Sequence, residues 1–321
     1  MKYITIFNKE GITVFLLEGE MLVPFLHFPS SLSFSVVPVY NFLLTHMERL
    51  HVMGCGLKGK LVRLLSMGVG FHYGKNKIIT SIARRVAARL ATAIRNKAVN
   101  DAKELCATGQ CAIAMPRLQC AINFWHLPSI AHMAWLLFDG REGVARDTKR
   151  AYELAEKGFL LGCNDCKGVL ALFYMLGYRV KYDAKRSLEL ARESSDAGSR
   201  YGHYVLANLH QLGMGGLQQD YSKAIAFYRL AAEQALDEAQ YELGLLLMRG
   251  CSECLDDDGL QWLHLAADQR NPKACFWLGD YYEDGSMVEE NETEAIKWYL
   301  LAQAAGHPCA ADALQRLQDR K

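Results

Sequence analysis

Pairs of closely spaced cysteines are the residues of this chain that most directly suggest chemistry. Two CxxC pairs occur, Cys163 with Cys166 and Cys251 with Cys254. Together they have the composition of a four-thiolate zinc site, and each pair alone could form a disulfide or bind a metal with a nearby His or Asp. In the helical repeats inferred below, the pairs would lie at opposite ends of helices of about 12 residues, roughly 18 Å apart at a rise of 1.5 Å per residue. We therefore predict no metal site and no cofactor, and we expect Cys166 to be a core residue.

No catalytic signature accompanies the cysteines. The sequence contains no Walker, HExxH or GxSxG motif, and its ten histidines are scattered. The acidic run at 256–258 lacks the spacing of glycine and distal glutamate that a calcium loop has. We therefore predict no catalytic residues and a chain that is not an enzyme. An enzyme would require titratable side chains that cluster in a pocket.

Charge is distributed unevenly along the chain. Residues 1–100 contain 13 Lys and Arg against 4 Asp and Glu, whereas residues 101–321 contain 23 against 31, and the net charge is only +1. Hydrophobic residues make up 51% of the 321 residues, which excludes a wholly disordered chain. We therefore expect a basic leader followed by an acidic folded region.

The first part of the leader is apolar. Residues 21–47 contain no charged side chain and are long enough to span a membrane. Three prolines interrupt them, so a broken or interfacial segment, or an uncleaved targeting sequence, fits as well. We interpret residues 1–48 as a poorly structured or helical leader, with membrane contact as an open alternative.

The second part of the leader, residues 49–100, contains eleven Lys and Arg and no acid. Within it, residues 78–99 show an amphipathic helical pattern that resembles a mitochondrial transit peptide, although it lies far from the N-terminus. We hypothesise that the physiological start is Met67. The alternatives are a basic helix packed on the first repeat or lying on an anionic membrane. We predict no specific nucleic-acid partner, and an intracellular chain, cytoplasmic or mitochondrial.

A repeat of 35–37 residues organises the region from 129 to 306. Each of five units has a small residue followed six positions later by glycine, and further columns of small residues come after it. We predict that a helix ends at each glycine, and that an Asp such as Asp147, Asp183 or Asp220 caps a second helix. Since no unit can bury its apolar face alone, the units must stack. The small-residue and glycine pairs are Ala134 and Gly140, Ala171 and Gly177, Ala207 and Gly213, Gly244 and Gly250, and Gly279 and Gly285.

The repeated unit resembles a known family. The sequences LGLLLMRG, at 243–250, and QDYSKAIAFYRLAAEQ, at 219–234, are similar to the Sel-1-like repeat family, relatives of the tetratricopeptide repeats. The resemblance covers residues 129–306 as five repeats and implies an all-α fold, a right-handed α-α superhelix of helix–turn–helix repeats. We expect capping helices or a degenerate repeat at residues 101–128 and a C-terminal capping helix at 307–321.

The resemblance also implies a binding groove. By analogy with tetratricopeptide grooves, the residues one, four and five positions after the small residue are expected to line the concave face. They change from aromatic to polar to acidic along the chain, which predicts a protein or peptide ligand with an apolar end and a basic end. Packing on neighbouring repeats is the alternative, and we expect about a third of these residues to be exposed. They are Trp135, Phe138, Asp139, Asn208, Gln211, Leu212, Leu245, Met248, Arg249, Asp280, Glu283 and Asp284.

Members of this family are often adaptors in protein complexes. The resemblance therefore favours a non-enzymatic interaction scaffold or adaptor. The alternatives are an enzyme-associated regulatory subunit and a mitochondrial assembly factor that the basic helix directs to the organelle.

Overall fold

The computed structural model describes residues 2–8, 11–18, 21–29, 92–93, 95–123, 126–141, 143–249, 259–286 and 288–319. The chain divides into two compact units, residues 1–92 and residues 93–321. Each unit is described by itself.

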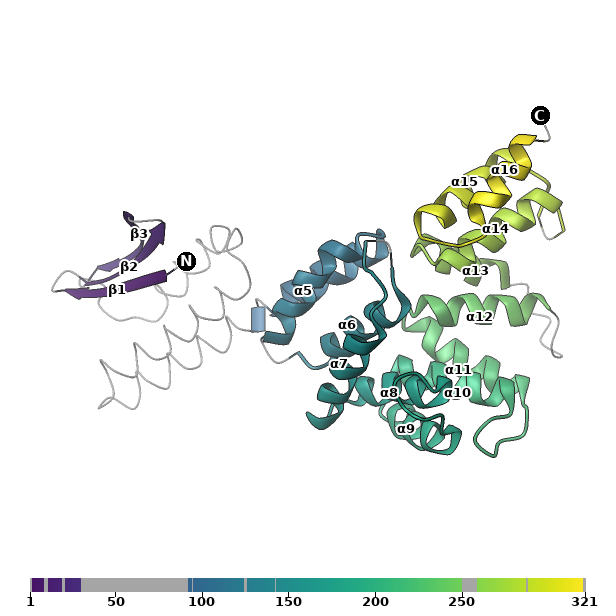
Figure 1. The fold of residues 1–321 in the computed structure, drawn as a ribbon, viewed down its shortest axis with the longest axis horizontal. Coiled ribbons are helices and arrows are strands. Elements are labelled where there is room, and N and C mark those ends of the chain that lie inside the picture. The colour runs from purple at the N-terminus through teal and green to yellow at the C-terminus, as the bar shows by residue number, and fades with distance from the viewer. Residues whose placement is uncertain are drawn as a thin grey trace. The chain divides into compact units, whose positions relative to one another are not determined.

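Three strands form the described part of the first unit. β1 (Lys2–Asn8), β2 (Gly11–Glu18) and β3 (Met21–Pro29) make an antiparallel sheet in the order β1-β2-β3 (Figure 1). Pro24 lies on the edge strand β3, where the missing N–H group of a proline is tolerated, and the register shifts between its partner Phe15 and Val14.

The expectation of a poorly structured or helical leader is wrong for residues 2–8, 11–18 and 21–29, which are strands. These segments are rich in β-branched and aromatic residues, which favour strands. The prediction for this region rested on the lack of charge and the three prolines of residues 21–47. The remainder of residues 21–47, and residues 78–91 of the amphipathic pattern, lie outside the described residues. Within the described part of the chain, no helix is both long and apolar enough to cross a membrane.

The second unit is a stack of helix pairs, and the predicted all-α solenoid is confirmed (Figure 1). Residues 95–107 are helical and precede α5, and α16 follows the last pair. The five pairs between them are α6 with α7, α8 with α9, α10 with α11, α12 with α13, and α14 with α15. The bounds are α5 (Cys111–Asn123), α6 (Pro128–Asp139), α7 (Thr148–Leu160), α8 (Asn164–Leu176), α9 (Ala184–Asp196), α10 (Arg200–Leu212), α11 (Tyr221–Glu233), α12 (Asp237–Met248), α13 (Gly259–Asp268), α14 (Pro272–Asp284), α15 (Glu292–Ala304) and α16 (Ala310–Asp319).

The turns inside the first, second, third and fifth pairs have the predicted chemistry, whereas the fourth turn lies outside the described residues. Gly177, Gly213 and Gly285 end their helices in the left-handed conformation, with φ of 67°, 65° and 66°. The predicted caps are confirmed, because Asp147, Asp183 and Asp220 each accept a hydrogen bond from the backbone N–H three residues later, and Asn291 does the same in the fifth repeat. The backbone N–H of each capping residue also donates to a carbonyl of the preceding helix, at 2.8–3.0 Å. The described turns therefore share the cap and the backbone bond of the capping residue, although those of repeats one and three have one residue more between the glycine and the cap.

The connection between successive repeats also has a recurring conformation. Gly162, Gly198 and Gly306 have φ between 79° and 89°, and Ala235 and Arg270, at the equivalent positions, have φ of 56° and 60°. Arg270 breaks the column of small residues in the sequence and yet adopts the same backbone. Residues other than glycine are strained at these positive φ values. Packing of the repeats therefore overrides the preference of Ala235 and Arg270 for negative φ.

Small residues let the helices approach one another closely. An added Cβ at Gly202 would lie 2.5 Å from the backbone nitrogen of Ser195, and one at Gly168 would lie 2.6 Å from the backbone nitrogen of Gly202. No side-chain rearrangement can relieve contacts with backbone atoms, so α8, α9 and α10 depend on glycine here. Ser194 takes the place of a glycine in its column, and its hydroxyl donates to the carbonyl of Asn164 at 2.7 Å.

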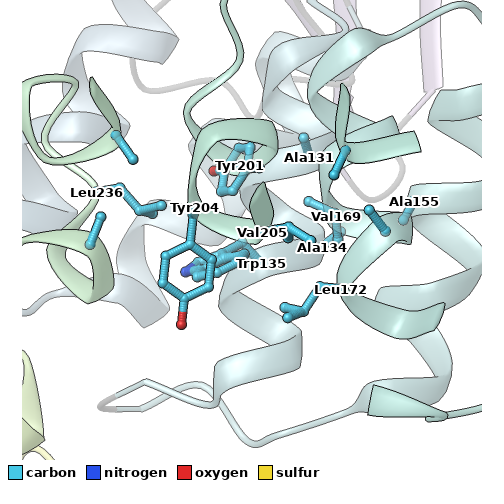
Figure 2. Packing of buried hydrophobic residues seen from close by; sticks show 14 of the residues in the cluster. Ala131, Ala134, Trp135, Ala155, Val169, Leu172, Tyr201, Tyr204, Val205 and Leu236 are labelled. Atoms are coloured by element: carbon cyan, nitrogen blue, oxygen red, sulfur yellow. The ribbon is translucent and has the colours of Figure 1, made fainter. Parts of the chain in front are cut away.

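One continuous core runs from Ala102 to Leu247. Figure 2 shows its aromatic centre, where Trp135 of α6 lies beside Tyr201 and Tyr204 of α10. The ring centroids are 5.1 Å apart for Trp135 and Tyr201, and 5.5 Å apart for Trp135 and Tyr204. The first repeat thus contacts the third as well as the second.

Candidate functional site

A buried arginine joins repeats that are far apart in the sequence. Arg141 follows α6, and only 7% of its side chain is exposed. Its Nε lies 2.5 Å from Asp139 Oδ2, its Nη2 lies 2.5 Å from Asp237 Oδ2, and Nη2 also donates to Glu238 Oε1. Asp237 and Glu238 are the first residues of α12, so this ion-pair group connects the first repeat to the fourth.

Two further side chains complete this group, which we call the Arg141 cluster. Trp135 Nε1 donates to Glu238 Oε2 at 3.3 Å. Asn271, the N-cap of α14, donates from Nδ2 to Asp237 Oδ2 at 2.9 Å and to Glu238 Oε1 at 3.3 Å. Its own Oδ1 accepts from two backbone N–H groups of α14. The cluster therefore also includes the fifth repeat, and its members are Trp135, Asp139, Arg141, Asp237, Glu238 and Asn271.

The protonation states in the cluster depend on the single cation, Arg141, being surrounded by three carboxyl groups. These belong to Asp139, Asp237 and Glu238. Burial alone would lower the pKa of Arg141, but Asp237 and Glu238 outweigh it and hold that pKa well above its usual value. Burial opposes the charge of Asp237, yet Arg141 keeps the pKa of Asp237 low. Burial raises the pKa of Glu238 well above its usual value, because Arg141 offsets it only in part and Asp237 adds to it. The cluster thus favours an ionised Asp237 beside a protonated Glu238.

A protonated carboxyl next to an ionised one is an arrangement that acid–base enzymes use. In this chain Arg141 and Asn271 bind both carboxyl groups. The side chains of Asp237 and Glu238 are only 13% and 8% exposed. The Arg141 cluster can therefore hold the repeats together. It was not predicted from the sequence. Arg141 itself was the available signal, because the residue after the glycine is Tyr178, Met214 or Ser286 in the other described turns.

A serine–histidine contact is the second arrangement that the sequence analysis missed. Ser195 Oγ lies 2.8 Å from His203 Nδ1, and the His203 ring stacks on Phe227. Burial lowers the pKa of His203, which suits a base. A nucleophile–base pair also requires a group that orients the histidine, and among the described residues no carboxylate bonds to His203. The contact therefore joins the end of α9 to α10 without the remaining parts of a catalytic triad.

His132 on α6 gives the solenoid a predictable response to acid. Burial, together with the charge of nearby Arg200, lowers its pKa from the usual 6.5 to about 3. The unfolded chain therefore binds a proton on His132 between pH 6.5 and 3 that the folded chain does not, and stability contributed by neutral His132 is lost as the pH falls through this range. We expect the difference in free energy of unfolding between wild type and His132→Phe to fall from pH 7 to pH 4, as measured by urea unfolding. A difference that is independent of pH would contradict this assignment.

The expected groove residues of the first repeat belong to the core or to internal contacts. Trp135 is 4% exposed and cannot contact a ligand directly. Phe138 and Asp139 are half-buried, Phe138 against Phe173 and Asp139 against Arg141. These residues fill the interior where an open groove was expected.

The later groove positions are more accessible. Asn208 and Gln211 are half-buried and bond to Tyr204 and Tyr228 of the same repeat. Of the twelve positions, Leu212, Arg249 and Asp284 are exposed, whereas Met248, Asp280 and Glu283 are half-buried and Leu245 is buried.

Three carboxyls lie on one face of α14. Tyr299 donates its hydroxyl to Glu283 Oε2 at 2.7 Å, and Arg316 Nη2 approaches the same atom at 3.5 Å. Asp280 has a weaker contact with Tyr299, at 3.5 Å. Burial raises the pKa of Asp280, and the charges of Asp284 and Glu283 raise it further. The face of α14 therefore carries more negative charge than its neighbours neutralise.

The cysteines of the described CxxC pair are buried free thiols. Cys163 is 4% exposed and Cys166 is 0% exposed, so the expected core role of Cys166 is confirmed. A hydrogen bond with Cys166 lowers the pKa of Cys163. Among the described residues, no group of three or more His, Cys, Asp or Glu could hold a metal ion. Cys251 and Cys254 lie outside the described residues, so a zinc site there stays untested.

Comparison with known proteins relates the repeats to a family. The family model of the Sel1 repeat matches residues 128–163, 169–199, 200–236, 237–271 and 272–307. Chitin synthase regulatory factor 3 of Schizosaccharomyces pombe is 29% identical over 141 residues, which are 43% of this chain and 15% of that protein. Chitin synthase regulator SKT5 of Saccharomyces cerevisiae is 30% identical over 128 residues, 39% of this chain and 18% of that protein. DAP3-binding cell death enhancer 1 of Mus musculus is 34% identical over 96 residues, 30% of this chain and 18% of that protein. The matched regions span less than a fifth of these relatives.

Solved structures with a similar arrangement include two repeat proteins from bacteria. The protective antigen c5321 of uropathogenic Escherichia coli, which displays an SLR fold, is 24% identical with a TM-score of 0.47, over 83% of this chain and 57% of that one. A Sel1 repeat protein from Oxalobacter formigenes is 21% identical with a TM-score of 0.46, over 69% of this chain and 98% of that one.

Proposed function

Because the chain belongs to the Sel1 repeat family, we propose that it is a non-enzymatic scaffold or adaptor that binds a protein partner through its repeats. Curated relatives are named as regulators or as a binding protein, which supports a role in protein interaction. Regulation of an enzyme by this chain is a narrower form of the same proposal, since two of those relatives are named for chitin synthase.

The proposed binding surface is the C-terminal part of the concave face. The N-terminal part is filled by Trp135 and the Arg141 cluster, so it offers no room for a ligand. Burial raises the pKa of Asp280, and the negative charges of Asp284 and Glu283 raise it further, so a Lys or Arg of a partner would find uncompensated carboxylates here. This excess charge is the observation that carries the proposal. We therefore propose, as the sequence predicted, that the partner binds here through a basic segment. Met248 and Arg249 are the predicted groove positions of the preceding repeat.

We expect Asp280→Lys/Asp284→Lys to reduce the capture of partner proteins at least tenfold, about 1.4 kcal/mol or more, without unfolding the chain. Glu283 is left unchanged because Tyr299 and Arg316 bond to it. The measurement is affinity purification from the native cell with quantified partners, together with circular dichroism of both chains.

The matched control, Asp196→Lys/Glu233→Lys, reverses the charge of two exposed acidic residues. They lie on α9 and α11, the second helices of their repeats. It has the same charge change and is expected to capture partners as wild type does. Equal capture by all three chains would contradict the proposed surface, and equal loss in both variants would show an effect of net charge alone.

The cellular location stays a prediction, cytoplasmic or mitochondrial. A mitochondrial assembly factor remains the alternative favoured by the basic pattern at 78–99, of which only residues 92–93 and 95–99 are described, as helix. Contact with a membrane through residues 21–47 or 78–99 is likewise a proposal, because most of both segments lies outside the described residues.

A further inference from the structure

The cysteine pair Cys163 and Cys166 lies at the connection between the first two repeats. Cys163 is the N-cap of α8, and Cys166 follows three residues later in the first turn of that helix. Both are free thiols, and a hydrogen bond joins the two sulfur atoms. Reactive cysteines in CxxC motifs have this spacing, and the N-terminus of a helix favours the thiolate form.

Packing of the repeats does not require the sulfur of Cys166. Its Sγ lies against Gly158 of α7, where an added Cβ would overlap the sulfur. The chain thus has a glycine inside a helix, where glycine is less stable than alanine, and this glycine makes room for a thiol. At three later connections alanine occupies both positions and is fully buried. These pairs are Ala231 with Ala239, Ala266 with Ala274, and Ala302 with Ala310.

Cys163 is the cysteine of the pair that ionises. The hydrogen bond from the Cys166 thiol lowers the pKa of Cys163, and the backbone N–H groups of Asp165 and Cys166 at the start of α8 lower it further. Burial and the charge of Asp165 oppose these effects without cancelling them. The same hydrogen bond, together with burial, raises the pKa of Cys166. Because the thiolate is the nucleophile in sulfur chemistry, Cys163 is placed to react first and Cys166 second.

Access from solvent differs between the two sulfur atoms in the same sense. Cys163 is 4% exposed, and its neighbours Gly162 and Asn164 are both exposed, so a molecule as small as hydrogen peroxide has a short path to it. Cys166 is 0% exposed. Oxidation of a cysteine follows thiolate character and access, and a second cysteine beside it can resolve the product. Cys163 and Cys166 therefore have the arrangement of a reacting and a resolving cysteine.

We propose that Cys163 and Cys166 form a redox-active pair that hydrogen peroxide oxidises to a disulfide. The Cys163 thiolate attacks one peroxide oxygen, so that an S–O bond forms, the O–O bond breaks, and the hydroxide that leaves is protonated to water. Cys163 is then a sulfenic acid. Cys166 gives up its proton and attacks the Cys163 sulfur, so that the S–S bond forms, the S–O bond breaks and a second water leaves. The two thiols lose two electrons, one peroxide is reduced to two waters, and a dithiol reductant reverses the change.

Mass spectrometry of the full chain tests the proposal. The reduced chain is treated with hydrogen peroxide, quenched with acid and alkylated in urea, and trypsin then releases residues 158–167 as one peptide that contains both cysteines. We expect this peptide to lose two hydrogen atoms and to escape alkylation, and we expect dithiothreitol to restore both thiols.

Cys275 serves as a control in the same sample. It is a buried free thiol with its pKa raised to about 12, and its Sγ donates to the carbonyl of Ala267 rather than to a second thiol. We expect Cys275 to oxidise at least about tenfold more slowly than the pair, because it lacks the thiolate that attacks the peroxide.

Two single variants assign the roles of the cysteines. Cys166→Ala removes the resolving thiol, and Cys163 is expected to accumulate as a sulfenic acid that dimedone traps. Cys163→Ser removes the thiolate, and Cys166 is expected to stay as open to alkylation as Cys275. Combining Cys166→Ala with Gly158→Ala restores the alanine pair of the later repeats, and this chain is expected to unfold at the urea concentration of wild type or above.

Three results would overturn the proposal. The first is a pair that oxidises in the folded wild-type chain no faster than Cys275, since both thiols would then be core residues alone. The second is a dimedone adduct on Cys166 in Cys163→Ser, or none on Cys163 in Cys166→Ala, because either contradicts the order of attack. The third is a Gly158→Ala/Cys166→Ala chain that unfolds at a lower urea concentration, because packing would then require the Cys166 sulfur.

Discussion

Replacing Arg141 with methionine is expected to destabilise the solenoid by about 3–5 kcal/mol. The methionine keeps most of the volume of the arginine but leaves Asp237 and Asp139 without their cation. Both carboxylates are partly or fully buried, and Asp237 has its pKa held low by Arg141. Removing one partner of a buried ion pair is costly because the remaining charge has neither water nor a counter-ion. The measurement is the free energy of unfolding in urea at neutral pH.

A matched control separates this effect from the general loss of an arginine. Arg146, in the same turn, is exposed and lies over the rings of Phe138 and Tyr178, at 5.6 Å from each centroid. Arg146→Met is expected to cost no more than about 1 kcal/mol. Adding Asp237→Asn to Arg141→Met removes one uncompensated charge and should recover part of the loss. Equal destabilisation by Arg141→Met and Arg146→Met would show that the cluster is not a buried ion-pair group.

The sequence predicted the features that repeat from one unit to the next. Asp147, Asp183 and Asp220 could be assigned as caps because the cap is a local contact over three residues. The small-residue columns predicted close packing because it involves neighbouring repeats, as at Gly202 and Ser195. Periodicity records contacts of this kind, since each repeat meets its neighbours in the same way.

The sequence could not predict contacts between repeats that are not neighbours. Trp135 bonds to Glu238, 103 residues away, because the winding of the superhelix brings the first and fourth repeats together. No column describes such a contact, as it occurs once in the chain. The groove analogy selected Trp135, which lies in the core instead. The strands β1, β2 and β3 were missed for another reason, since they lie outside the repeat and the prediction there rested on the charge and the prolines of residues 21–47.

Trp135→Ala is expected to destabilise the chain by about 3–5 kcal/mol, because the indole is 4% exposed and its removal leaves a cavity beside Tyr201 and Tyr204. Trp135→Phe keeps a ring in the core but deletes the Nε1–H donor to Glu238, and a smaller loss of about 1–3 kcal/mol is expected. Urea unfolding of both variants separates packing from the hydrogen bond.

Tyr182→Ala supplies the comparison with an exposed aromatic residue. Tyr182 is 55% exposed, so its truncation is expected to change the free energy of unfolding by no more than about 0.5 kcal/mol. The same chains distinguish the two roles that Trp135 could have. A core residue loses stability in both substitutions, in the order Ala greater than Phe. A groove residue would instead leave the stability of Trp135→Ala close to that of Tyr182→Ala and would lower partner capture, which would return the first repeat to the binding surface.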